Sequence, residues 1–169
     1  MSTLTLPLAV LGALVAALIE TSIAPELTIA GAQVDLVLVL AVLAAMLIGP
    51  DDGLVWAFLG GLMLDMLIPA RPIGASALTM LLVVGLALLA ARVPGPRRTL
   101  AVATVFAVTW AFHLLLLVVM AATEGVLLGS MQPLLVLSAA VQNTVVAILA
   151  AIAFAAIGRR FAPAERPDW

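Results

Sequence analysis

The sequence predicts an all-α integral membrane protein whose six transmembrane helices form one compact bundle. Hydrophobic residues make up 66% of the chain and charged residues 9%, against about 45–50% and about 25% in soluble domains. Too few polar residues remain to cover a water-soluble globule, so lipid is expected to surround most of the chain. Six of the seven arginines lie in two of the gaps between apolar stretches, which is typical of a multi-pass membrane protein.

Each span is read from an apolar stretch, since about 20 such residues cross about 30 Å of hydrocarbon. The expected spans are Leu4–Ala24, Val34–Ile48, Leu54–Ile68, Gly74–Ala91, Leu100–Ala122 and Pro133–Gly158. The first lacks the basic start of a cleaved signal, so we expect it to be kept. The second and third are short. The Gly49–Gly53 segment between them is expected to be a turn. Two full spans are preferred, with a hairpin that enters and returns as the alternative.

Domain organisation follows from how little chain lies outside these spans. Residues 1–158 form a single six-span transmembrane domain, and residues 159–169 form a short tail. The gaps are about ten residues at most, so no soluble domain is expected between the spans. Any activity must therefore reside in the bilayer or in very short loops.

Arginine placement sets the expected orientation, because cytoplasmic loops carry the excess of positive charge. One cluster follows the fourth span and the other follows the sixth: Arg92, Arg97 and Arg98, and Arg159, Arg160 and Arg166. An even number of crossings separates them, so both clusters and both termini are expected in the cytoplasm. The outer segments then carry acidic residues, with Arg71 as their one cation.

Small residues line one face of the third span at intervals of four residues, Gly53, Ala57 and Gly61, and Asp65 ends the row; Gly60 widens it. Small residues let helices approach closely in lipid. We therefore expect this face to pack against a helix, either of a partner or of the protein itself.

Asp65 precedes an irregular turn that contains Arg71, Pro72 and Gly74. The preferred interpretation is that its carboxylate supports this turn. Direct contact with a partner or ligand is the alternative.

Five further polar residues lie within or at the ends of spans, where they are costly and normally face the bundle interior. They are Glu20, Asp35, His113, Gln142 and Asn143. Glu20 is expected to be solvated at the interface, with pairing to Arg71 as the alternative. His113 is expected to form a hydrogen bond that holds helices together. Gln142 and Asn143 are expected to join helices, with a polar cavity as the alternative.

Several classes of site are excluded by what the chain lacks. There is no cysteine and only one histidine, so thiolate and histidine-based metal sites are not expected. No phosphate-binding glycine loop with lysine, nucleophile elbow or His-Glu-x-x-His pair occurs. No basic surface with interleaved aromatic residues points to nucleic acid. The sequence therefore predicts no catalytic residues, no cofactor and no enzyme activity.

One stretch of the sequence carries a family resemblance. It combines Gly61-Leu62, Asp65, Pro72-x-Gly74 and Ala77-Leu78, and Asp35-Leu36 stands at the head of the second span. These motifs and the layout of the spans resemble the MreD family, small membrane proteins of the bacterial rod-shape system. The chain departs from the family pattern, since Pro69-Ala70-Arg71 occupies the place of a glycine that often follows the aspartate. Gly85 also precedes leucine rather than tyrosine.

The resemblance implies a non-catalytic scaffold of the peptidoglycan elongation machinery in the bacterial cytoplasmic membrane. It implies a single-span MreC-like partner and, indirectly, MreB, RodA and a class B penicillin-binding transpeptidase. It also implies the bundle fold of the substrate-binding S components of energy-coupling factor transporters. On this basis, the Gly53–Ala57–Gly61 face is expected to receive the partner helix or to support the surface that does.

The alternative is that the chain is itself an S component of a vitamin transporter. Such proteins often carry an Ala-x-x-x-Ala motif in their first helix for docking the coupling subunit, and Ala9, Ala13 and Ala17 match it. The loops, however, lack the polar and aromatic residues expected around a vitamin.

Overall fold

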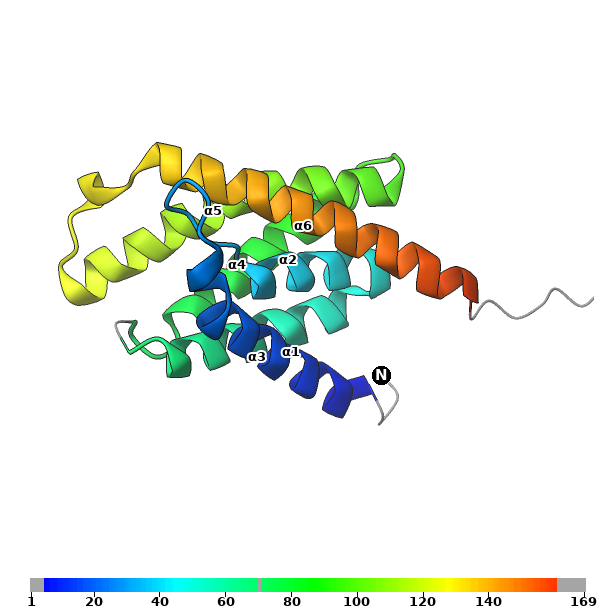
Figure 1. Ribbon diagram of the computed structural model, residues 1–169, viewed down its shortest axis with the longest axis horizontal. Coiled ribbons are helices and arrows are strands. Elements are labelled where there is room, and N and C mark those ends of the chain that lie inside the picture. Colours follow the sequence, from blue (N-terminus) through cyan, green and yellow to red (C-terminus); the bar gives the residue numbers. More distant parts are fainter. Residues whose placement is uncertain (1–4, 70, 161–169) are drawn as a thin grey trace, which may run out of the picture.

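The computed structural model describes residues 5–69 and 71–160, and all regular elements of these residues are helices (Figure 1). The six main helices are α1 (Thr5–Ser22), α2 (Leu36–Leu43), α3 (Pro50–Leu67), α4 (Ala75–Ala90), α5 (Arg97–Glu124) and α6 (Pro133–Arg160). Three short helical segments complete the list: η1 (Ala24–Leu27), η2 (Ala44–Ile48) and η3 (Leu128–Ser130). The six predicted helices are therefore confirmed.

The predicted turn at Gly49–Gly53 is wrong, because α3 begins at Pro50 and includes most of it. Gly49 alone separates η2 from α3, with an extended backbone (φ 174°, ψ 157°). Proline is favourable at the first position of a helix, where its missing N–H costs nothing. Asp51 and Asp52 in the first turn complement the positive end of the helix dipole. The residues that resembled a breaker thus start a helix.

Helix α2 is short and central. Its eight residues and the five of η2, a π-helical turn, extend about 20 Å, less than the roughly 30 Å of a bilayer core. The other helices form an arc around it in the order α1, α3, α4, α5, α6, each in contact with the next, and α2 contacts all five. Within the described residues α6 does not contact α1, so the arc stays open between them.

The connections divide between the two ends of the bundle (Figure 1). Residues 23–35, 68–69, 71–74 and 125–132 lie at one end, which we call the loop end. The start of α1, the turn at Gly49, the loop of residues 91–96 and the end of α6 lie at the other, which we call the terminal end. The loop end carries Arg71, and the terminal end carries Arg92 and Arg97.

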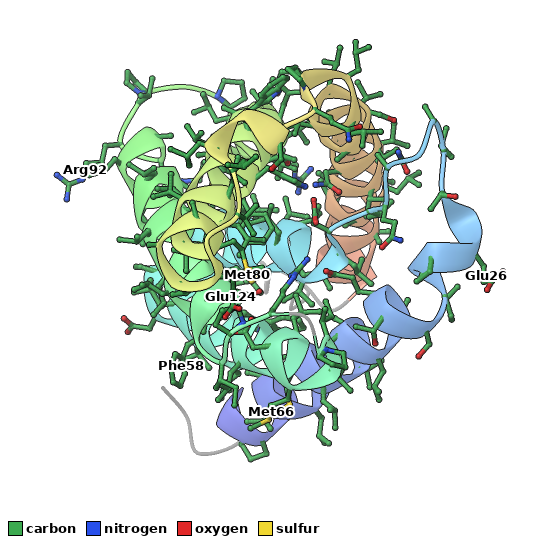
Figure 2. All side chains as sticks on the ribbon, turned by 90° about the vertical axis from the view of Figure 1, so that its left-hand side faces the viewer. Glu26, Phe58, Met66, Met80, Arg92 and Glu124 are labelled. Atoms are coloured by element: carbon green, nitrogen blue, oxygen red, sulfur yellow. The ribbon has the colours of Figure 1, made fainter. Side chains whose placement is uncertain are left out.

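The bundle has an apolar core that also encloses several polar side chains, and many large apolar side chains are exposed on its surface. Buried polar side chains include Glu20, Asp65, Thr109 and Asn143. On α6, by contrast, large apolar side chains such as Leu149 and Ile152 are exposed. In Figure 2, Phe58 and Met66 point away from the bundle while Met80 lies inside it. This distribution suits a surface that meets lipid.

Among the residues that the structure describes, two helices are long and apolar enough to cross a membrane, Arg97–Glu124 and Pro133–Ala153. Three apolar helices are shorter, Ala9–Ser22, Leu36–Ile48 and Ala75–Ala90. Length and composition thus give weak support for a membrane protein, and crossing by all six helices stays a prediction.

The small-residue face of α3 is covered by the protein's own helices. A Cβ at Gly61 would lie 2.5 Å from Ala77 Cα of α4, and one at Gly53 would collide with the backbone of Ala45 in η2. A Cβ at Gly60 would collide with the side chain of Val37 in α2. Ala57 is fully buried. The expectation of close helix packing is therefore confirmed, but a partner helix cannot reach this face, and direct docking there is wrong.

We expect Gly61→Ala to destabilise the fold by about 1–3 kcal/mol, because the new methyl group would push α4 away from α3. Gly85→Ala in α4 is the matched control, since no atom lies within 4 Å of a Cβ there. Alanine is the better helix former, so the control should be neutral or stabilising by up to about 1 kcal/mol. Thermal unfolding in detergent would measure both. Equal melting temperatures would contradict the close packing of α3 and α4.

Candidate functional site

Asp65 caps the start of α4. Its carboxylate accepts backbone N–H groups of Gly74 (2.9 Å), Ser76 (2.9 Å) and Ala77 (3.3 Å). Gly74 can turn the chain into the helix because its backbone is left-handed (φ 94°), which glycine adopts without strain. Asp65 is only 3% exposed, so its carboxylate serves the turn and offers no surface to a partner.

Arg71 lies in the same turn, where its Nη1 donates a hydrogen bond to Ser76 Oγ (3.1 Å). Pro72 precedes the cap, and its carbonyl oxygen accepts a hydrogen bond from Ala75 N. The residues of the 69–74 turn that were singled out from the sequence therefore act together with Asp65. This agrees with the structural interpretation of that carboxylate.

Glu20 performs the corresponding role for the central helix. It is 9% exposed, and its Oε2 accepts the backbone N–H of Val37 in the first turn of α2 (2.8 Å). The expectation of a solvated glutamate is wrong, because the N-terminus of α2 lies inside the bundle and its N–H groups need acceptors. The described residues show no Glu20–Arg71 ion pair, although the charges of Arg71 and Asp35 both act on Glu20.

Asn143 joins three helices at the head of α2. Its Oδ1 accepts the backbone N–H of Asp35 (2.8 Å), and its Nδ2 donates to Asp35 Oδ2 (2.8 Å) and to Thr109 Oγ1 of α5 (3.1 Å). Its side chain is fully buried. The prediction that Asn143 joins helices is confirmed.

His113 faces the same aspartate from α5. Its Nδ1 lies 3.0 Å from the carbonyl oxygen of Thr109, which can only accept, so Nδ1 carries the hydrogen. Its Nε2 lies 3.9 Å from Asp35 Oδ2, within ion-pair range but beyond a hydrogen bond. The hydrogen bond expected of His113 is thus made within its own helix, and its other nitrogen is left open.

Gln142 and Ser138 on α6 hold a loop rather than another helix, which corrects the expectation for Gln142. Ser138 Oγ and Gln142 Nε2 both donate to the carbonyl oxygen of Ile29, at 2.9 and 3.1 Å. Gln142 Oε1 is buried without a hydrogen-bond partner in the structure. These contacts fix residues 28–34 against the bundle.

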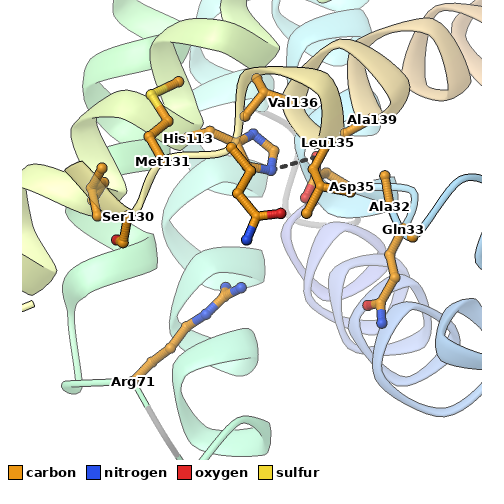
Figure 3. Close-up of a pocket in the computed structure, with 13 residues that line it drawn as sticks. Ala32, Gln33, Asp35, Arg71, His113, Ser130, Met131, Leu135, Val136 and Ala139 are labelled. Atoms are coloured by element: carbon orange, nitrogen blue, oxygen red, sulfur yellow. Dashed lines mark ion pairs between the residues drawn. The ribbon is translucent and has the colours of Figure 1, made fainter. Parts of the chain in front are cut away.

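A cavity of about 360 Å³ opens at the loop end beside this cluster (Figure 3). Asp35, His113 and Arg71 line its polar side, and Figure 3 shows Arg71 pointing toward the cavity from the opposite wall to Asp35. Leu135, Val136 and other residues of α5 and α6 form an apolar wall. The polar cavity, left open as an alternative from the sequence, is present, but it is lined by Asp35 and His113 rather than by Gln142 or Asn143.

The cavity brings together side chains that can donate and accept hydrogen bonds. No group of three or more His, Asp or Glu side chains that could hold a metal occurs among the residues the structure describes. Sequence reasoning missed that Gln33 and Gln132 also line the cavity. Both lie in short loops with no periodic pattern, so only the folded chain brings them to the site.

We expect Asp65→Asn to lower the free energy of unfolding by about 1–3 kcal/mol, because the amide nitrogen cannot accept the N–H groups that the carboxylate accepts. Asp51→Asn is the matched control at the exposed start of α3 and should cost less than about 1 kcal/mol. Thermal unfolding of the purified protein in detergent would measure the difference. An unchanged melting temperature for Asp65→Asn would show that the cap is dispensable.

Asn143→Ala should destabilise the protein by about 1–3 kcal/mol, because it leaves the half-buried N–H of Asp35 unpaired and removes the bond to Thr109 Oγ1 that joins α6 to α5. The neighbouring Thr144→Ala serves as control, since the hydroxyl group of Thr144 donates to Ala140 O of its own helix (2.6 Å) and joins no other helix among the described residues. That change should stay within about 0.5 kcal/mol. Equal losses in the two variants, measured by thermal unfolding, would refute the joining role of Asn143.

No family model, curated protein sequence or solved structure matches this chain. The resemblance to the MreD family therefore rests on the motif residues. The geometry gives several of these residues, Asp65, Pro72, Gly74 and Asp35, definite places in two helix-capping arrangements.

Proposed function

We propose that this protein is a non-catalytic scaffold of the bacterial rod-shape and cell-wall elongation machinery, located in the cytoplasmic membrane as a multi-pass protein. The support is the resemblance to MreD, together with the many large apolar side chains that the bundle exposes. Asp65 and Gly74, which carry part of the resemblance, form the cap that starts α4. The terminal end, with Arg92 and Arg97, faces the cytoplasm in this proposal.

The observation that carries the proposal is the open side of the bundle between α6 and α1. Every other neighbouring pair in the arc is in contact, so this side is where one more helix would complete the ring. An apolar groove of about 890 Å³ lies along α6 on the side of residues 26–34, the segment that follows α1 and leads to α2. Its lining includes Leu137, Val141 and Val145, which are 42–52% exposed.

A transmembrane helix of a single-span partner fits this groove in chemistry and in form. The groove is apolar, as expected of a surface that meets a helix within lipid, and it follows the long axis of α6. In lipid such helices associate by close packing rather than by the hydrophobic effect, so an open groove offers more contact than a convex surface. We assign it to an MreC-like partner, through which MreB, RodA and a class B penicillin-binding transpeptidase would be reached indirectly.

The second candidate, an S component of a vitamin transporter, is favoured by one observation, the polar cavity at the loop end. Another observation disfavours it. Ala9, Ala13 and Ala17 are at most 7% exposed, so the alanine row that would dock a coupling subunit is covered by the rest of the bundle.

We expect Val145→Trp to reduce capture of the co-expressed MreC-like protein from the same bacterium by about tenfold or more, because an indole would fill the groove. Leu86→Trp is the matched control: Leu86 is similarly exposed, at 49%, but lies on α4, away from the groove. Capture would be quantified in mild detergent at equal expression of each variant.

Equal capture by the two tryptophan variants would exclude the groove as the docking site. Failure of the unaltered protein to bind the MreC-like protein would contradict the scaffold function itself. Recovery of paired ATPases with a coupling membrane subunit would instead establish the transporter alternative.

A further inference from the structure

The cavity at the loop end presents three groups with unused hydrogen-bonding capacity. Asn143 donates to Oδ2 of Asp35, whereas Oδ1 accepts no hydrogen bond from the described residues. His113 Nε2 has no partner within hydrogen-bond distance in that part of the chain. Arg71 uses only Nη1, toward Ser76, so its remaining N–H groups have no acceptor among those residues. Unused groups that converge on one cavity are the usual mark of a ligand site.

The charges and hydrogen-bonding roles of these three groups determine which ligand the cavity can bind. Asp35 and the lone pair on His113 Nε2 both accept hydrogen bonds, so together they suit a donor with a positive charge. Arg71, pointing in from the opposite wall (Figure 3), suits an anion that can take two parallel N–H groups. A purely anionic ligand would face Asp35 unfavourably, and a purely cationic one would face Arg71 unfavourably.

The tautomer of His113 strengthens the case for a donor. Because Nδ1 donates to the Thr109 carbonyl oxygen, the neutral ring directs a lone pair toward the Asp35 carboxylate 3.9 Å away. Two acceptors that face each other at this distance leave space for an N–H donor to bond to both. A primary ammonium has three such N–H groups, whereas a quaternary ammonium has none.

The rest of the wall is apolar and indicates that the ligand is an amphiphile. Leu117, Met131, Leu135 and Val136 line the side formed by α5, α6 and the loop between them. A volume of about 360 Å³ lies at the low end of the range for small-molecule sites, about 300–1,000 Å³. The site also lies at an end of the bundle, where the polar headgroups of a surrounding bilayer would be.

We propose that this cavity binds a zwitterion that carries a primary ammonium and a phosphate, the headgroup chemistry of phosphatidylethanolamine. The ammonium lies between Asp35 and His113, the phosphate is held by Arg71, and the apolar wall receives the start of the lipid chains. The site is separate from the groove on α6, so it does not depend on the scaffold function. The same headgroup could also arrive as free phosphoethanolamine.

The test compares binding of three lipids with identical acyl chains, measured by native mass spectrometry of the detergent-purified full chain. Phosphatidylethanolamine should bind about tenfold or more tightly than phosphatidylcholine, which has no ammonium N–H, and than phosphatidylglycerol, which is anionic. Equal affinity for the three lipids would overturn the proposal. Competition between free phosphoethanolamine and the lipid would show that the headgroup is recognised without its chains. Binding of free phosphoethanolamine without binding of the lipid would identify a soluble zwitterion as the ligand.

Two variants test the assigned groups. Arg71→Gln should weaken phosphatidylethanolamine binding by about tenfold, whereas Arg92→Gln, an exposed arginine at the other end, should leave it unchanged. His113→Phe should remove the preference for ethanolamine over choline while retaining a ring beside Phe112. Melting temperatures measured without lipid identify a variant that fails to fold. The lipid preference of the remaining variant then tests the site. Unchanged lipid preference in a folded variant would refute the site.

Discussion

The buried N-terminus of α2 is the constraint on which the rest of the bundle depends. This short helix starts within the bundle, where the N–H of Val37 is buried and that of Asp35 is half-buried, and no preceding turn of helix supplies acceptors for them. An unpaired amide in such a place costs roughly 1–3 kcal/mol or more. Glu20 from α1 binds the N–H of Val37, and Asn143 from α6 binds that of Asp35. The helices on the two sides of the open arc are therefore both tied to the same helix end.

The start of α4 follows the same principle, with Asp65 in the place of Glu20. In both cases a carboxylate near the end of one helix accepts N–H groups at the beginning of another. A carboxylate suits this position because it can accept several bonds at once, as Asp65 does from Gly74, Ser76 and Ala77. The cost of burying these acidic groups is thus offset by the backbone groups that they satisfy.

The sequence was sufficient to predict the helices because apolar stretches of helical length can be recognised without knowing what packs against them. It was also sufficient to predict that Gly53 and Gly61 permit close packing, since the spacing alone places them on one face. It was insufficient to predict what packs there, because the covering residues Ala45 and Ala77 lie on other helices. The role of Glu20 was missed for the same reason: its partner, Val37, is 17 positions away along the chain.

The polar cavity and the apolar groove share one wall, the segment of residues 28–34. Gly31 and Gln33 line the cavity, whereas Thr28 and Ile29 line the groove, and Gln142 and Ser138 fix the segment to α6 between them. If a headgroup and a partner helix both favour the same arrangement of this segment, linkage requires that each raise the affinity of the other by the same factor. The lipid composition of the membrane would then tune assembly without any catalytic step.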